Sequence, residues 1–283
     1  MKRIALKINV QKYKELACAK EVLAVLRSFC EKIYVEDTYK SLASEKVFFY
    51  GGDTIPKDSE LIMVLGGDGT MLHAACDAVK YDLPMLGINM GRVGYLASLE
   101  IGEIDTLARL DSDDFLEKQH MLLSVTVKKK NGEEIFLGYA LNDVVIDGKG
   151  HLADIRLNDG KNTLDYRANA LIAATPTGST AYSFSAGGPV MDEAMEAICI
   201  TPVCPRSFFS RSLLFAPSSV LSIENRRTRD GDLEISIDGY THTPLSYGDS
   251  VCVCRAQKRI RILALKERRL LEVLCTKMDT RYF

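Results

Sequence analysis

Short apolar runs alternate with helical patterns along the first ninety residues of the chain. The run at residues 61–65 is apolar at every position, which is typical of a strand buried between two helical layers. Further strands are expected at residues 4–10, 33–35 and 84–89, and helices at residues 11–30 and 71–79. This alternation predicts a parallel, doubly wound α/β sheet, whose ligand crevice lies beyond the carboxyl ends of its strands.

The pattern changes near residue 119 to short strands separated by turns. Asn131-Gly132 is a strong hairpin signal, and residues 158–160 form a second turn. Residues 181–198 are expected to be helical. Strands are expected at residues 123–127, 141–146, 155–157, 171–174, 220–223, 233–237 and 251–254. We therefore expect an α/β domain at residues 1–118, a β-rich, sandwich-like domain at residues 119–260, and a tail at residues 261–283.

A glycine-rich turn follows the apolar run at residues 61–65. Gly66, Gly67 and Gly69 surround Asp68, and Thr70 is expected to cap the following helix. A strand, a glycine turn and a helix start together favour phosphate binding. Asp68 is unfavourable beside phosphate unless it holds a metal ion or takes a proton. The alternative interpretation is a tight turn with a solvated aspartate.

A hydroxyl-rich segment occupies residues 175–183, between the apolar run at 170–174 and Ala186-Gly187-Gly188-Pro189. Five of its nine residues are serine or threonine, which is not a core composition. Such side chains can donate to phosphate and ribose oxygens, and Tyr182 offers an aromatic face for a base. The alternative is a loop whose hydroxyl groups satisfy its own backbone.

Two adjacent polar residues, Asn142 and Asp143, interrupt the strand expected at residues 141–146. Inside a strand they destabilise the fold unless they are paired or bind a ligand. An amide can recognise an adenine edge, and a carboxylate can accept from ribose hydroxyl groups. A strand end bonded to a neighbouring loop is the alternative. Asp238-Gly239 is a weaker signal, which a hairpin turn explains equally well.

Composition excludes several classes of function. The chain has 283 residues, and its 36 basic and 38 acidic residues nearly balance, so no overall field favours nucleic acid. No apolar run is long enough to cross a membrane, and no signal peptide is expected, because the first three residues lead directly into a strand pattern. The eight cysteines lack the spacing of metal sites, as do His120, His151 and His242. Free thiols favour a cytoplasmic protein.

The familiar nucleotide motifs are also missing. The chain has no G-x-x-x-x-G-K-[ST] sequence, which excludes a P-loop enzyme. The turn at residues 66–69 lacks the third glycine of the dinucleotide fingerprint, and the glycines at 87, 91 and 94 have the wrong spacing for it. A Rossmann-type dehydrogenase is therefore disfavoured.

The motifs at residues 66–70, 86–96, 142–143, 175–183 and 186–189 together resemble, in order, the signature motifs of the NAD kinase family. The resemblance implies an N-terminal doubly wound α/β domain, a C-terminal β-sandwich-like domain, and a tail that returns to the first domain. It further implies transfer of a phosphoryl group from ATP, or polyphosphate, to the 2′-hydroxyl of the adenosine ribose of NAD. Mg²⁺ or another divalent cation would assist. A homodimer or homotetramer that binds small-molecule nucleotides is expected.

The resemblance also implies roles for individual residues. Asp68 would act as the general base on the ribose hydroxyl, although a carboxylate of ordinary pKa is a weak base, so that orienting the hydroxyl or holding the metal ion are its alternative roles. No residue is otherwise assigned as a metal ligand. The nucleotide-binding positions would be Gly66, Gly67, Gly69, His73, Tyr95, Asn142, Asp143, Arg167, Asn169, Thr177, Thr180, Ala181, Tyr182, Ser183 and Ser185.

The sequence departs from the family pattern at two positions, and two alternatives to NAD kinase activity stay open. Asn169 stands where many relatives have aspartate, and Tyr240 stands where glutamine often follows Asp-Gly. The loss of charge at Asn169 leaves open a non-catalytic dinucleotide sensor. Because the glycine turn also occurs in lipid kinases of the diacylglycerol type, such a kinase is the enzymatic alternative, disfavoured by the motifs directed at ribose.

Overall fold

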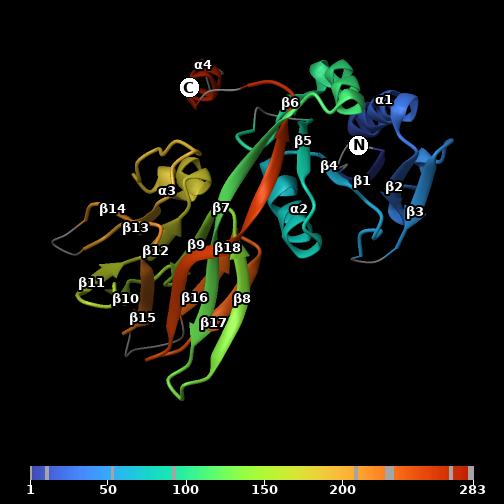
Figure 1. The fold of residues 1–283 in the computed structure, drawn as a ribbon. Helices are drawn as coiled ribbons and strands as arrows, with labels where there is room; N and C mark the ends of the chain where they lie inside the picture. Colours follow the sequence, from blue (N-terminus) through green and yellow to red (C-terminus); the bar gives the residue numbers. More distant parts are fainter. Residues whose placement is uncertain are drawn as a thin grey trace. The chain divides into compact units, whose positions relative to one another are not determined.

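The computed structural model describes residues 2–9, 13–51, 54–90, 94–206, 210–226, 233–267 and 270–279. The chain divides into two compact units. The first unit comprises Met1–Gln119 together with Ile260–Phe283, and the second comprises His120–Arg259. Figure 1 shows the elements of each unit.

The first unit is built on a parallel sheet with the strand order β5-β4-β1-β2-β3. Strand β6 and the end of β18 also pair with β5, both in parallel. The order reverses between β1 and β4, which makes the ends of these two strands the switch point of the sheet. The strands are β1 (Arg3–Ile8), β2 (Lys32–Glu36), β3 (Val47–Tyr50), β4 (Leu61–Leu65), β5 (Met85–Asn89), β6 (Leu99–Glu100) and β18 (Ser250–Ala264).

Helices cover both faces of this sheet. On one face, α1 (Tyr13–Phe29) and the 3₁₀ segment η2 (Ile101–Ser112) share a core with alternate residues of β1 and β4. On the other face, α2 (Asp68–Tyr81) packs against β4 and β5. All five residues of β4 are consequently buried, as the apolar run predicts. The predicted doubly wound α/β fold is confirmed. The other helical elements described in this unit are η1 (Asp37–Leu42) and α4 (Leu270–Asp279).

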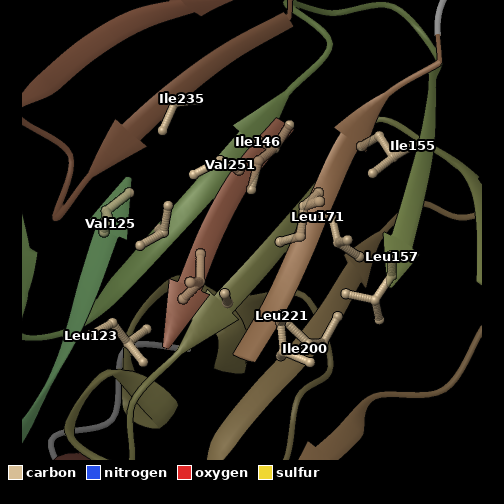
Figure 2. Packing of buried hydrophobic residues seen from close by; sticks show 14 of the residues in the cluster. Leu123, Val125, Ile146, Ile155, Leu157, Leu171, Ile200, Leu221, Ile235 and Val251 are labelled. Carbon is tan, nitrogen blue, oxygen red and sulfur yellow. The ribbon is translucent and has the colours of Figure 1, made fainter. Parts of the chain in front are cut away.

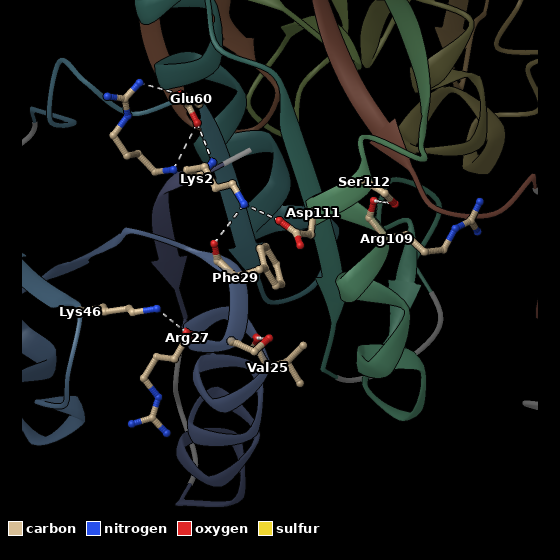
Figure 3. A network of polar contacts seen from close by, with 11 residues as sticks. Lys2, Val25, Arg27, Phe29, Lys46, Glu60, Arg109, Asp111 and Ser112 are labelled. Carbon is tan, nitrogen blue, oxygen red and sulfur yellow. Dashed lines mark hydrogen bonds and ion pairs between the residues drawn. The ribbon is translucent and has the colours of Figure 1, made fainter.

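A polar network fixes the start of β1 (Figure 3). The Lys2 backbone N–H donates to Glu60 Oε2 at 2.7 Å, and the Arg3 guanidinium donates to Glu60 Oε1 at 2.6 Å. The Lys2 ammonium group also pairs with Asp111 of η2 and donates to the Phe29 carbonyl oxygen. Exposed ion pairs of this kind each contribute at most about 1 kcal/mol to the free energy of unfolding. The main effect of the network is therefore to hold the start of β1 in place.

The second unit is a β-sandwich. One sheet has the order β14-β13-β12-β9-β16-β17, with antiparallel pairing throughout. The other contains β11-β10-β15-β18 and the hairpin β7-β8. The remaining strands are β7 (Leu116–Lys128), β8 (Glu134–Ala140), β9 (Asp143–Asp147), β10 (Ala153–Asn158), β11 (Thr163–Ala168), β12 (Ala170–Ala174), β13 (Ile198–Val203), β14 (Leu213–Phe215), β15 (Val220–Asn225), β16 (Leu233–Ile237) and β17 (Thr241–Leu245).

Apolar side chains from both sheets fill the space between them. Figure 2 shows Ile146 and Leu171 of one sheet together with Leu157 and Leu221 of the other, and all four side chains are buried. Burial of such side chains is the main source of stability for this unit. The predicted sandwich is thus confirmed, and the turns predicted at Asn131-Gly132 and residues 158–160 are also present.

The helix predicted at residues 181–198 is wrong. The structure has a 3₁₀ turn η3 (Thr177–Thr180) and a single-turn helix α3 (Tyr182–Ser185), followed by irregular chain up to β13. Gly187 adopts a φ of 86°, which ends the helix, and Pro189 follows. Among the described residues, no helix is both long and apolar enough to span a bilayer.

Candidate active site

The glycine turn after β4 lies at the switch point of the first unit. The Asn9 backbone N–H donates to the Leu65 carbonyl at 3.0 Å, and the Asn9 side-chain amide donates to Thr70 Oγ1 at 3.2 Å. A Cβ at Gly66 would overlap the Thr70 side chain, so only glycine fits there. The expectation that Thr70 caps the helix is wrong, because α2 begins at Asp68 and its N-cap is Gly67.

The Asp68 carboxylate is held by backbone amides of a neighbouring loop. Its Oδ2 accepts from the Tyr95 N–H at 2.9 Å, and its Oδ1 accepts from the Leu96 N–H at 3.1 Å. Gly94 lies against the same carboxylate, and a Cβ there would overlap Oδ1. These contacts fix the orientation of the Asp68 carboxylate.

The other predicted site residues of this unit differ in solvent exposure. Gly67 is exposed and has open space where a Cβ would lie, so a ligand can approach its backbone. Tyr95 is half-buried, and burial, followed by the negative charge of Asp68, raises the pKa of its hydroxyl. Gly69 and His73 are exposed on the first two turns of α2.

In the second unit, the hydroxyl-rich segment packs directly on Asn142. The Thr175 N–H donates to the Asn142 carbonyl at 2.9 Å, and Thr175 Oγ1 donates to the Leu141 carbonyl. A Cβ at Gly178 would overlap the Asn142 backbone. The structure therefore brings together two motifs that lie more than thirty residues apart in the sequence.

Asn142 lies in the bend before β9, not inside a strand as expected. Its Oδ1 is buried and has no hydrogen-bond partner among the described residues. The next residue, Asp143, begins β9 and is 5% exposed. Burial, and then the negative charge of Asp238, raise the pKa of Asp143 to about 7. A buried amide oxygen without a partner beside a proton-binding carboxyl group is an arrangement suited to a polar ligand.

The hydroxyl groups of the segment fall into two sets. Ser179 and Ser183 are fully buried and bond within the protein, to Met191 and Thr201 respectively. Ser183 therefore does not present its side chain at the surface, although it is a predicted site residue. Exposed or half-buried hydroxyl groups are those of Thr177, Thr180 and Tyr182, and of Ser185 just beyond the segment; Ala181, which has no hydroxyl group, is also half-buried.

Two polar residues near this segment were not predicted as site residues. His120 is 3% exposed, and its Nδ1 lies 3.0 Å from Thr177 Oγ1. Asp238 accepts hydrogen bonds from the backbone of residues 141–143. The sequence carries only weak signals for them, namely a lone histidine without metal spacing and an Asp-Gly turn pair.

Arg167 and Asn169 lie at the opposite end of β12 from Asp143. Asp143 pairs with Ala174, whereas Asn169 precedes the first residue of β12 and bonds through its backbone to Val203. The four residue steps from Ala170 to Ala174 span about 13 Å along β12. Arg167 is exposed, and its Nε lies 3.6 Å from Asp154 Oδ1. These two residues are thus separated from Asn142 and Asp143 by about the length of a strand.

The described residues do not form a metal centre by themselves. In the described part of the chain, no group of three or more His, Cys, Asp or Glu side chains could hold a metal ion. A divalent cation at this site would take most of its ligands from substrate phosphates, which is the usual mode for Mg²⁺.

Comparison with known proteins identifies the family. The ATP-NAD kinase N-terminal domain matches residues 3–113, and the ATP-NAD kinase C-terminal domain matches residues 132–265. The NAD kinase of Natranaerobius thermophilus is 31% identical over 283 residues, which cover 98% of each chain. This chain belongs to the NAD kinase family. The NAD kinase of Geobacter sulfurreducens is 39% identical over 231 residues, which cover 80% of each chain.

Solved structures of NAD kinase family members share the fold. The yeast NADH kinase complexed with NADH superposes with a TM-score of 0.85 at 23% identity, and the match covers 100% of this chain and 89% of that one. An NAD kinase from Archaeoglobus fulgidus in complex with ATP gives a TM-score of 0.71 at 20% identity, with 97% and 99% covered. Lipid kinase activity, the enzymatic alternative, is not favoured by these matches.

Proposed function

We propose that this chain transfers the γ-phosphoryl group of ATP to the 2′-hydroxyl of the adenosine ribose of NAD, forming NADP and ADP. The observation that carries the proposal is membership of the NAD kinase family, which the two domain matches and the full-length relative establish together. The reaction forms a P–O bond to the ribose oxygen, breaks the bond between the β- and γ-phosphates, and releases the hydroxyl proton.

Asp68 is proposed to orient the 2′-hydroxyl and to accept its proton. What supports this role is the fixed geometry of the carboxylate, which accepts from the Tyr95 and Leu96 amides and still lies at the edge of the open glycine turn. Because phosphoryl transfer depends mainly on positioning and charge neutralisation, orienting the hydroxyl is the larger part of its task.

The second unit is proposed to bind NAD. The orphaned amide oxygen of Asn142 fits an adenine amino group, which is a donor, and the Asp143 carboxylate fits ribose hydroxyl groups. Thr177, Thr180, Ala181, Tyr182 and Ser185 would line the adjoining surface. Arg167 and Asn169, about one strand length away, would contact the more distant part of the dinucleotide.

The donor is proposed to bind at the glycine turn of the first unit as a complex with Mg²⁺ or another divalent cation. Gly67 and Gly69 are exposed residues at the start of α2, so phosphate oxygens can approach their backbone, and the positive end of α2 favours the same charge. His73, exposed in the second turn of α2, lies where a phosphate could be contacted. Polyphosphate, which offers the same chemistry, is the other donor considered.

Assembly and location complete the proposal. We propose that the protein is a homodimer or homotetramer, as expected for the NAD kinase family, and that it acts on small-molecule nucleotides in the cytoplasm. Support for the compartment comes from the cysteines, all eight of which are free thiols in the structure. No nucleic acid or membrane partner is proposed, since the net charge is close to zero.

The test of the function is an assay of purified protein with NAD, ATP and Mg²⁺. NADP should accumulate with an equal amount of ADP, whereas a diacylglycerol acceptor should remain unphosphorylated. The Asp68→Asn variant keeps the size of the side chain and should lose roughly 100-fold or more in turnover, the usual scale for loss of proton transfer. Bound NAD with no NADP above background would instead identify a dinucleotide sensor.

A further inference from the structure

Asp238 occupies the tight turn between β16 and β17. Its φ is 50° and that of Gly239 is 77°, and the Tyr240 N–H donates to the Ile237 carbonyl at 3.0 Å. Two-residue turns with positive φ at both positions favour Asn or Asp followed by Gly. Because asparagine would serve this turn equally well, the turn alone does not explain the carboxylate.

The Asp238 carboxylate binds three consecutive backbone amides of another segment. Oδ2 accepts from the Leu141 N–H at 2.8 Å, while Oδ1 accepts from the Asn142 N–H at 2.8 Å and the Asp143 N–H at 3.0 Å. In return, the Asp238 N–H donates to the Asp143 carbonyl at 3.0 Å. These residues connect β8 to β9, so the carboxylate supplies the acceptor oxygens for the amides at this connection.

The same carboxylate also lies beside the Asp143 side chain. Burial raises the pKa of Asp238, while its bonds to the three backbone amides act in the opposite direction. Its negative charge adds to burial in raising the pKa of Asp143 to about 7. The buried carboxyl group of Asp143 and the half-buried one of Asp238 therefore flank the peptide that presents the orphaned Asn142 amide oxygen.

We propose that Asp238 is a positioning residue for nucleotide binding, whose carboxylate fixes the backbone of residues 141–143 and so aims Asn142 and Asp143 at the adenosine half of NAD. The inference rests on the proposed function, because Asn142 and Asp143 are assigned to NAD there. Asp238 itself touches no substrate in this account. It acts through three amides and through its charge.

The charge of Asp238 gives the proposal a signature in pH. Besides burial, the charged group that opposes ionisation of Asp143 is Asp238, from the β16–β17 turn. Tyr182 of α3 is a second titratable group close to Asp143, and burial, followed by acidic neighbours that include Asp143, raises the pKa of the Tyr182 hydroxyl. Binding that needs the Asp143 carboxylate should weaken as pH falls below about 7, and removal of the Asp238 charge should move this midpoint to lower pH.

The experiment compares NAD binding by the full-length protein and by Asp238→Asn between pH 5.5 and pH 8.5, using titration calorimetry without ATP. Asparagine keeps the turn but cannot accept from all three amides. The dissociation constant at pH 8 should rise at least tenfold, and the midpoint of the pH dependence should fall. In turnover assays the KM for NAD should rise by the same factor while the KM for ATP changes less than twofold.

The matched control is Asp159→Asn. Asp159 also lies in a hairpin turn of this unit, and its Oδ1 accepts from the Lys161 and Asn162 amides, but these residues join β10 to β11 and do not belong to the segment 141–143. This variant should bind NAD within twofold of the original protein, with an unchanged pH midpoint. An equal loss in both variants would show that only general stability is at stake and would overturn the proposal.

Two further results would also overturn it. One is an Asp238→Asn variant that binds NAD within twofold of the original protein, and the other is weaker binding with an unmoved pH midpoint. If Asp238→Asn does not fold, Asp238→Glu keeps the charge but displaces the oxygens, and should weaken binding without lowering the midpoint. Normal binding by the Glu variant would contradict the proposal. Because binding is read without turnover, failure to make NADP would count against the proposed function alone.

Discussion

Single residues show how far side-chain chemistry can be anticipated from sequence. Asn142 and Asp143 stand out because adjacent polar residues interrupt an apolar pattern, and the structure indeed gives them unusual surroundings. Ser183 is a different case, because a dense hydroxyl pattern cannot reveal that this hydroxyl group faces inward to Thr201. Asp238 is harder still, since its partners lie almost one hundred residues away in the sequence.

The buried Asp143 carboxyl group should lower the stability of the unliganded protein at neutral pH. Its pKa is raised from 3.8 to about 7, so the folded state binds this proton more tightly than the unfolded state. Stability from this group is therefore full below about pH 4 and is lost as pH rises through about 7. Asp143→Asn should raise the Tm by a few degrees at pH 8, and the difference should vanish near pH 4.

Calorimetry of both proteins across this pH range measures the effect. A Tm for Asp143→Asn that equals or falls below the original value at pH 8 would contradict the raised pKa. The same variant should bind NAD more weakly, because the neutral amide cannot replace a carboxylate that accepts from two ribose hydroxyl groups. We therefore expect Asp143→Asn to be more stable but to bind NAD more weakly, which is common for substitutions at binding sites.

At the scale of elements, periodicity predicts regular segments well and their ends poorly. The strand at residues 61–65 agrees with β4, since an unbroken apolar run leaves no alternative. The helix expected at residues 181–198 is wrong because its apolar residues pack on the outer face of a sheet as irregular chain. The start of α2 differs because the N-cap is Gly67, which makes no side-chain hydrogen bond, so that the helix begins at Asp68 and already contains Thr70.

Packing of the 3₁₀ turn η3 on Asn142 should be sensitive to one methyl group. A Cβ at Gly178 would overlap backbone atoms of Asn142, which cannot move away as a flexible side chain would. Gly178→Ala should lower the free energy of unfolding by about 1–3 kcal/mol, the usual scale of overpacking, and should weaken NAD binding. Urea unfolding and calorimetry measure the two effects.

Gly102→Ala is the control for this substitution. Gly102 lies in η2 of the other unit and has open space where the Cβ would be placed. The free energy of unfolding should stay within about 0.5 kcal/mol or rise. Equal stability of the two variants would mean that the contact between Gly178 and Asn142 is not tight.

The whole molecule depends on pairings that no local pattern reveals. Resemblance predicts a tail returning to the first unit, and Ile260–Phe283 belongs to that unit. The sequence does not reveal that β18 pairs in parallel with β5 through Ile262 and Met85, nor that Leu263 and Leu265 enter the first core. The register of such strand pairs depends on contacts between distant parts of the sequence. Hydrophobic periodicity shows only which side of a single strand is buried.

The returning strand should therefore contribute strongly to stability. Leu263 is fully buried, and its carbonyl accepts from Ser98 Oγ. Leu263→Ala should lower the free energy of unfolding by about 2–5 kcal/mol, as expected for a large-to-small change in a core. Hydrogen exchange should accelerate at the amides of β5. The control is Leu214→Ala, where the side chain is 53% exposed and the change should stay within about 0.5 kcal/mol.

Transfer to one particular oxygen of NAD is the central claim, and the position of the transferred phosphate tests it most directly. The protein should be incubated with NAD, Mg²⁺ and ATP labelled at the γ-phosphate, and the product examined by ³¹P NMR and label counting. The account predicts one labelled phosphate per product molecule, on the 2′-oxygen of the adenosine ribose, with almost none formed by Asp68→Asn. Label on any other oxygen, or equal transfer by the Asp68 variant, would contradict it.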